Sequence, residues 1–437
     1  MNYNSSKYLP WVRNFSSTVL NRVISTLSQI ILIPIFMNLW GKEFYGEWLL
    51  LCTLPNHLSA SDFGINFTAT NQICLLVAKK KHNEALDLFR STNMASLVFT
   101  FIFSLLFIIS SYVFDWREIL NIKLFSEQTI EITLFFLIIS VFAAFFFGAA
   151  LGIYRSEGRY DKFINFVTIL QVADIISLLI NLYFKANILS ISISSFIIRL
   201  LLCSFIIVDL QSKYLWFRFG FSSDMRVVLP LLPTSIYYMI ITMGQGLVLQ
   251  GTTFLVGTHL GASTLVTFST IRTLINSIKA FVGAFYSSFS PEFTVTIAQN
   301  QYKRAQRLYK VMLSYTFLFT IAFTIFYYLV GDYIMFYWTK GKINLEQPLF
   351  TYMLVLGLVN TLGSCAYTVL NATNENKVVG IFSAILSFFT MIGIFFTVNG
   401  GLLNVVTILL IADSILLVIS FLTALRIVKG GNNLKIT

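Results

Sequence analysis

The sequence predicts an all-α, polytopic membrane protein with about twelve transmembrane helices. Three observations favour this fold class: 57% of the 437 residues are hydrophobic, only 11% are charged, and the mean hydropathy is +0.78. Soluble domains carry about 25% charged residues. Because a bilayer core needs about 20 apolar residues per helix, a chain of this length with short connections has room for about a dozen spans. This composition excludes a soluble enzyme with a single membrane anchor.

Apolar runs of spanning length follow one another along the whole chain. The runs near 44–77 and 262–297 are longer than a straight span requires, so we expect tilted or bent helices there. Pro55 lies inside one run, and Pro230 and Pro233 lie near the start of another; proline removes a helical hydrogen bond and kinks the helix. The twelve runs lie near 13–39, 44–77, 86–114, 128–154, 162–184, 188–212, 226–258, 262–297, 308–338, 349–370, 376–398 and 401–427.

The basic residues predict the orientation of the spans. With a cytoplasmic N-terminus, 20 of the 30 Lys and Arg residues fall in inside segments, 6 in outside segments and 4 within the membrane. The positive-inside rule therefore predicts that both termini are cytoplasmic. We interpret the net charge of +11 as a signal that orients the protein in the membrane and not as a nucleic-acid-binding surface.

Catalytic and metal-binding patterns are not expected from this sequence. It contains no phosphate-binding loop, no HExxH and no GxSxG. The short outer connections leave no extramembrane domain for a membrane glycosyltransferase or polymerase. The four cysteines lie in apolar runs without close pairing or a histidine cluster, which argues against a metal site.

The chain resembles itself at a shift of 220 residues. Aligned pairs include Gly41 with Gly261, Asn56 with Asn276 and Arg90 with Lys310. Apolar matches arise by chance in membrane sequences, but a shared frame that includes a polar asparagine favours a duplication. Six helices per half then predict two pseudo-symmetric six-helix lobes, 1–218 and 219–437, around a central cavity.

Ionisable residues inside the membrane mark the candidate site, because each costs at least about 2.5–3.5 kcal/mol there. Arg272, Asn276 and Lys279 are spaced i, i+4 and i+7 and share one helix face. We interpret this face as a cavity wall that binds an anion; the alternative is that each cation pairs with a carboxylate of another helix. Arg22 is either a third cation of this site or a residue that snorkels to the cytoplasmic face. Asn56 either binds sugar hydroxyls together with Asn276 or hydrogen-bonds across helices.

Three carboxylates complete the set of polar candidates. Asp174 and Arg199 lie roughly fourteen and fifteen residues from the inner ends of their helices, at nearly equal depth. We therefore expect them to form a structural ion pair that fixes helix packing. Asp62 and Asp413 are interpreted as coupling or gating residues that carry a proton, or else as partners of the cations; these alternatives stay open.

Short motifs in the first half of the chain resemble those of a known transporter family. Ile33-Pro34 closes the first helix, residues 39–48 read LWGKEFYGEW, Asp62-Phe63-Gly64-Ile65 follows in the second helix, and residues 155–159 read RSEGR after the fourth. With the six-plus-six plan, these features resemble the polysaccharide-exporter family. Its members are the O-antigen and capsule repeat-unit flippases of the multidrug/oligosaccharidyl-lipid/polysaccharide flippase superfamily. The resemblance covers essentially the whole chain.

The resemblance implies a transporter of the bacterial cytoplasmic membrane. It would move an undecaprenyl-diphosphate-linked oligosaccharide from the inner to the outer leaflet by alternating access, in lipopolysaccharide or capsule biosynthesis. Arg272 and Lys279, with Arg22, would bind the diphosphate, since Arg and Lys form charge-assisted hydrogen bonds to phosphate oxygens. The implied partners are this lipid-linked substrate, membrane lipids and other polysaccharide-assembly membrane proteins. No cofactor is implied, and coupling to a proton or to sodium stays open.

Two other functions stay open at this point. A cation-coupled multidrug extruder of the same superfamily would carry cationic cargo, and its cavity should be acidic. A non-transporting membrane scaffold of polysaccharide assembly would tolerate removal of the charge at Arg272.

Overall fold

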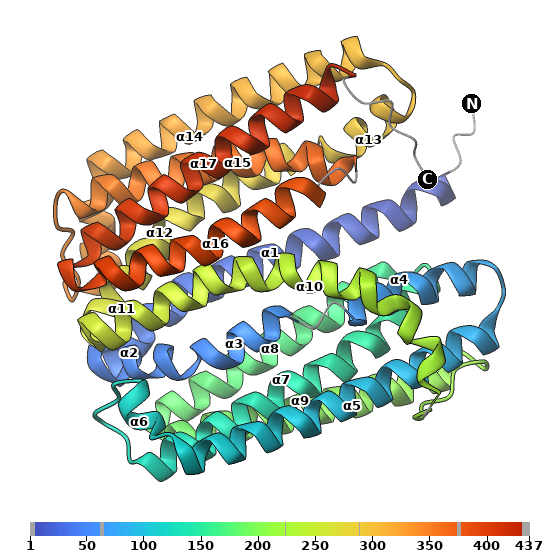
Figure 1. Ribbon diagram of the computed structural model, residues 1–437, viewed down its shortest axis with the longest axis horizontal. Helices are drawn as coiled ribbons and strands as arrows, with labels where there is room; N and C mark the ends of the chain where they lie inside the picture. Colours follow the sequence, from blue (N-terminus) through green and yellow to red (C-terminus); the bar gives the residue numbers. More distant parts are fainter. Residues whose placement is uncertain (1–4, 62–64, 223, 288, 374–376, 431–437) are drawn as a thin grey trace. The chain divides into compact units, whose positions relative to one another are not determined.

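The computed structural model describes residues 5–61, 65–222, 224–287, 289–373 and 377–430. All regular elements in these residues are helices, which confirms the all-α fold class (Figure 1). Asp62, expected to act in coupling or gating, lies outside the described residues. The chain divides into two compact units, one of Met1–Leu32 with Asn38–Gly246 and one of Ile33–Met37 with Leu247–Thr437.

The first unit is built around α7 (Glu127–Ser156), which packs on α3, α4, α5, α6, α8 and α9 of the same unit. Its core is aromatic and aliphatic, with Phe142 and Tyr154 of α7 and Phe89 of α5 fully buried. The remaining helices are α1 (Ser5–Leu39), α2 (Lys42–Leu51), α3 (Thr53–Ser61), α4 (Ile65–Ala78), α5 (His82–Val113), α6 (Trp116–Ile119), α8 (Tyr160–Tyr183), α9 (Ile188–Lys213) and α10 (Leu232–Gly246). Two 3-10 turns, Met225–Val227 and Leu229–Leu231, precede α10.

The second unit is built around α15 (Leu349–Ala372), which packs on α12, α13, α14 and α17. It begins with a π-helical turn, Leu247–Gly251, that leads into α11. The other helices are α11 (Thr252–Leu260), α12 (Ala262–Ser287), α13 (Ser290–Ala298), α14 (Tyr302–Thr339), α16 (Lys377–Thr397) and α17 (Leu402–Val428), with a 3-10 turn at Val398–Gly400.

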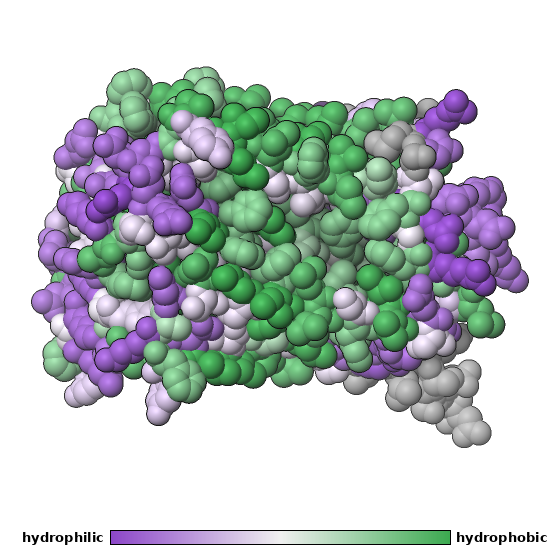
Figure 2. Space-filling view, turned by 90° about the horizontal axis from the view of Figure 1, so that it is seen from below, coloured by the Kyte–Doolittle hydropathy of each residue, from purple (hydrophilic) through white to green (hydrophobic). Residues whose placement is uncertain are grey.

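The helices have the composition of membrane spans. Ten of them, among the described residues, are long and apolar enough to cross a bilayer. The predicted run near 44–77 is divided among α2, α3 and α4, so it contributes only a shorter apolar helix, Thr68–Ala78. Helix α12 is also outside the ten, because its polar side chains interrupt the apolar sequence. On the face shown in Figure 2, hydrophobic side chains form a broad band and hydrophilic side chains gather at its ends.

The 220-residue frame recurs in the backbone. Gly41 before α2 has φ of 88°, and Gly261 before α12 has φ of 89°. Lys80 and Asn300, with φ of 61° and 56°, occupy the turns that follow α4 and α13. Both turns separate helix ends that are also 220 residues apart: α4 ends at Ala78 and α13 at Ala298, while α5 begins at His82 and α14 at Tyr302. The same succession of helix ends and left-handed turns thus occurs once in each unit.

Candidate functional site

Helix α12 presents one polar face, which carries Arg272, Asn276 and Lys279. Its opposite side is buried through aliphatic residues such as Val266 and Leu274. Asn276 is exposed, while Arg272 and Lys279 are half-buried. The i, i+4, i+7 spacing thus places the three polar side chains along one accessible stripe, as the sequence predicts.

Arg272 is held against α11 by neutral groups. Its guanidinium donates to Thr253 Oγ1 at 3.1 Å and to the Leu249 carbonyl oxygen at 3.5 Å, and it lies over the Phe268 ring, 5.0 Å from its centroid. Leu249 belongs to the π-helical turn, a geometry that departs from the regular i to i+4 hydrogen-bond ladder. A guanidinium keeps its charge in proteins, so these contacts to neutral groups orient a cation.

Lys279 and Asp413 meet through a third residue, Asn360. The Lys279 ammonium donates to Asn360 Oδ1 at 2.7 Å, and Asn360 Nδ2 donates to Asp413 Oδ2 at 2.8 Å. The three side chains come from α12, α15 and α17, so the network ties together the helices that pack on α15. The sequence analysis placed Lys279 in substrate binding and Asp413 in coupling, and it left open that a deep carboxylate and a cation are partners; the structure joins the two in one network.

Asn360 is the member of this network that the sequence analysis did not identify. An uncharged amide does not stand out against a polytopic membrane sequence as a lone charge does. It is nevertheless the most polar side chain between Leu349 and Leu370. Because an amide in the middle of an apolar helix usually hydrogen-bonds to another helix, that contrast was the available signal.

In the first unit, Asp174 and Arg199 form an ion pair. Arg199 Nη2 lies 3.0 Å from Asp174 Oδ2, and each side chain is 25% exposed. The pair joins α8 to α9. Arg22 of α1 and Asn56 of α3 are both exposed. Both belong to the first unit, whereas the Lys279 network lies within the second.

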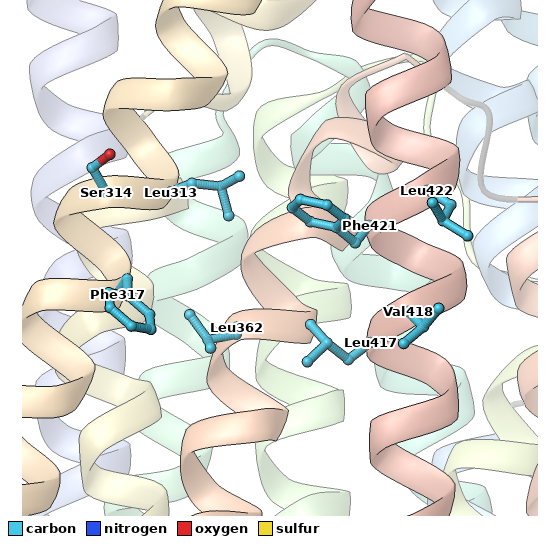
Figure 3. Close-up of a pocket in the computed structure, with 8 residues that line it drawn as sticks. All are labelled: Leu313, Ser314, Phe317, Leu362, Leu417, Val418, Phe421 and Leu422. Atoms are coloured by element: carbon cyan, nitrogen blue, oxygen red, sulfur yellow. The ribbon is translucent and has the colours of Figure 1, made fainter.

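An apolar cavity of about 490 Å³ lies among α14, α15 and α17 of the second unit (Figure 3). Seven of the eight side chains that line it are hydrocarbon, including Phe317, Leu362 and Leu417, and the eighth is Ser314. Leu417 lies one helical turn after Asp413 on α17. These lining side chains suit a hydrocarbon chain and not an anion. The cavity and the polar face of α12 therefore favour different chemical groups.

Comparisons with known proteins identify the fold. No family model and no curated protein matches the sequence. Among solved structures, the chain is similar to an inward-facing multidrug resistance MATE family transporter of the MOP superfamily. That match has a TM-score of 0.76 and 13% identity, and it covers 93% of this chain and 95% of the other. An outward-facing multidrug resistance MATE family transporter of the same superfamily matches with a TM-score of 0.66 and 14% identity, over 96% of each chain.

The protein has the MATE transporter fold. A third match, a MOP superfamily transporter from Pyrococcus furiosus, carries the description that reverse polarity of its binding pocket suggests a different function. It has a TM-score of 0.61 and 13% identity and covers 97% of this chain and 95% of the other. At these identities the MATE fold is what the comparisons establish. The chemistry of the site has to be argued from this chain's own residues.

Within this MATE fold, cations exceed carboxylates at the polar face. Helices α12, α15 and α17 carry Arg272, Lys279 and Arg426 against a single carboxylate, Asp413. Arg426 lies in the last turn of α17, which leaves two cations and one carboxylate further inside the helices. No group of three His, Cys, Asp or Glu side chains able to hold a metal occurs in the part of the chain that the structure describes. The face can therefore attract an anion.

Proposed function

We propose that the protein is a flippase that moves an undecaprenyl-diphosphate-linked oligosaccharide, of O-antigen or capsule type, from the inner to the outer leaflet of a bacterial cytoplasmic membrane by alternating access. Both termini would be cytoplasmic, as the distribution of basic residues predicts. The cargo consists of a diphosphate between a hydrocarbon tail and a polar glycan. The protein would act beside other polysaccharide-assembly membrane proteins.

The polar face of α12 is the observation that carries this proposal. Arg272 and Lys279 share that face with the exposed Asn276, and their contacts include a hydroxyl, a carbonyl and an amide oxygen. A diphosphate needs fixed positive charge to leave water, and Arg and Lys offer charge-assisted hydrogen bonds to its oxygens. Exposed asparagine side chains, Asn276 here and Asn56 in the first unit, are suited to sugar hydroxyls.

A multidrug extruder is the second candidate, because the similar solved structures include multidrug transporters. Its cargo would be a lipophilic cation. The observation against it is the charge of the face, because a helix face with two cations and one carboxylate repels a cationic drug. A non-transporting scaffold remains the third candidate and makes a different prediction for Arg272.

The deciding experiment measures the pool of lipid-linked oligosaccharides in membranes of the native host by mass spectrometry. Cells that lack the gene are complemented with the wild-type chain, Arg272→Ala, Lys279→Ala or Lys303→Ala. Lys303 is the matched control, a cation exposed at the start of α14. Immunoblots of the membranes check that each variant is present at the wild-type level.

We expect completed lipid-linked repeat units to accumulate without the gene and in both α12 variants, while Lys303→Ala restores the normal pool. If the lipid-linked pool changes without the gene but is normal in the α12 variants, the flippase function stands and the proposed binding site is wrong. A pool that never changes, together with increased sensitivity to a cationic dye in cells without the gene, would favour the multidrug extruder. Loss of glycan export in the null without accumulation of completed lipid-linked repeat units, together with normal export by Arg272→Ala, would favour the scaffold.

A further inference from the structure

Asn360 forms hydrogen bonds with two polar side chains, one as acceptor and one as donor. Its Oδ1 accepts from the Lys279 ammonium at 2.7 Å while its Nδ2 donates to Asp413 Oδ2 at 2.8 Å. A side-chain amide offers one acceptor and one donor group at a fixed separation. The two bonds therefore hold Lys279 and Asp413 in one arrangement, although no direct ion pair joins them in the described residues.

We propose that Asn360 is a positioning residue that makes anion binding at Lys279 and proton binding at Asp413 mutually dependent. The inference rests on the proposed function, since the anion is taken to be the diphosphate of an isoprenoid lipid. Phosphate oxygens that bind the Lys279 ammonium draw it away from Asn360 Oδ1. The amide is then free to turn, and Asp413 loses both its donor and its nearest cation. The carboxylate takes up one proton from water, and release of the anion returns that proton.

No other polar side chain near Asn360 on α15 is placed to substitute for it. The hydroxyl of Thr361 donates to the Gly357 carbonyl at 2.7 Å, and that of Ser364 donates to the Asn360 carbonyl at 2.8 Å. Both hydroxyls are therefore satisfied by the backbone of their own helix. The amide alone spans the distance from α12 to α17.

Few charged groups surround the network. Lys279 and Asp413 interact electrostatically with each other. Arg272 is a further cation on the same face of α12, about two turns from Lys279. The other ionisable side chains on α12, α15, α17 and the elements packed against them, outside the basic first turns of α14, are tyrosines, a cysteine and a few groups near helix ends. They are His259 of α11, Tyr286 of α12, Glu292 of α13, Tyr309, Tyr315, Tyr327, Tyr328, Asp332, Tyr333 and Tyr337 of α14, Tyr352, Cys365 and Tyr367 of α15, Lys377 of α16, and Arg426 of α17. The first turns of α14 carry Lys303, Arg304, Arg307 and Lys310.

The proposal has a thermodynamic consequence that can be measured. If anion binding is accompanied by proton uptake, each ligand strengthens the binding of the other by the same factor. Diphosphate affinity should then rise as the pH falls, by up to about tenfold per pH unit where Asp413 titrates. The diphosphate titrates as well, so the quantity of interest is the difference between the wild type and a variant in which Asp413 cannot titrate.

The experiment uses the full chain in lipid nanodiscs and farnesyl diphosphate as the probe. Isothermal titration calorimetry at one pH, in two buffers of different ionisation enthalpy, gives the number of protons taken up per diphosphate bound. The variants are Asp413→Asn, Asn360→Leu and Asn371→Leu. Asn371 is the matched control, an exposed asparagine on the same helix. Asn360→Ala serves as a second variant if Asn360→Leu does not yield a monodisperse protein.

We expect the wild type and Asn371→Leu to take up about one proton more than Asp413→Asn, and Asn360→Leu to match Asp413→Asn. A wild-type proton count in Asn360→Leu, or in Asp413→Asn, would overturn the inference and leave the anion site intact. Absence of farnesyl diphosphate binding by the wild type would instead overturn the proposed function, and the inference with it. The two failures are therefore distinguishable.

Discussion

Gly41 and Gly261 hold the same left-handed backbone conformation 220 residues apart, with φ of 88° and 89°. Each stands directly before a helix, α2 in the first unit and α12 in the second. Nothing lies within 4 Å of the Cβ atom that either position would carry. Backbone conformation, and not lack of space, therefore requires glycine at both turns.

Alanine at either turn should destabilise the protein. We expect Gly41→Ala and Gly261→Ala each to cost about 1–2 kcal/mol, because an L-residue is strained at positive φ. The measurement is thermal unfolding of the purified protein in detergent. Gly148→Ala is the control: its Cβ also meets nothing, but its backbone lies within the regular helix α7. Equal melting temperatures for all three variants would contradict the expectation.

Glu47 closes the α6–α7 connection onto α2. Its carboxylate, on a residue that is only 3% exposed, accepts from the backbone N–H groups of Lys123 and Leu124 at 2.8–3.1 Å. Removing it in Glu47→Ala leaves two donors without this acceptor, at a cost of about 1.5–3 kcal/mol. Limited proteolysis of the connection should then be faster. Glu43→Ala, an exposed carboxylate one turn earlier, should leave the rate unchanged.

The Asp174–Arg199 pair predicts a charge-swap rescue. Each single change, Asp174→Ala or Arg199→Ala, leaves one charge within the spans and should lower the amount of folded protein. Because each side chain is 25% exposed, we expect each single change to cost only on the order of 1–3 kcal/mol in free energy of folding. The double reversal Asp174→Arg with Arg199→Asp should recover folded protein. Lys185→Ala, exposed between α8 and α9, is the control, and a double variant no better than the singles would refute the pairing.

Gly357 sets the distance between α12 and α15 near the network. A Cβ there would lie 2.3 Å from Ile275 Cγ2, and Ile275 is only 5% exposed. We expect Gly357→Ala to cost about 1–3 kcal/mol through overpacking and to reduce transport, since Asn360 follows on the same helix. On that helix, Gly363→Ala would make only ordinary contacts, of 3.7 Å and longer, with Leu417. Its melting temperature and lipid-linked pool should stay normal.

Hydropathy predicted the helices because each span must satisfy its backbone internally in an apolar medium. Each of the twelve predicted runs is mainly helical in the residues that the structure describes. Hydropathy and Pro55 predicted a bent helix over the run near 44–77, but they could not predict its division into α2, α3 and α4. The break after Leu51, at Cys52, has no glycine or charge to announce it.

Contacts between the candidate residues could be predicted only where two residues lie at similar depth on consecutive helices. Asp174 and Arg199 sit on consecutive helices, so counting residues from the inner ends placed them side by side. Lys279 and Asp413 belong to helices that are far apart in sequence, and counting does not tell which helices are neighbours. Asn360 carries no charge, so its role emerged only from its contacts.

The wide sequence spacing of the Lys279 network has a consequence for biogenesis. Asn360 follows Lys279 by 81 residues, and Asp413 follows Asn360 by a further 53. A ribosome therefore delivers α12 to the translocon with two cations and none of their later neighbours, at a cost of about 2.5–3.5 kcal/mol for each cation on insertion scales. Asp174 and Arg199, only 25 residues apart, can enter together as a helical hairpin. Helix α17 thus completes the environment of a helix made much earlier, and chains that end before α17 should leave α12 poorly inserted and exposed to quality-control proteases.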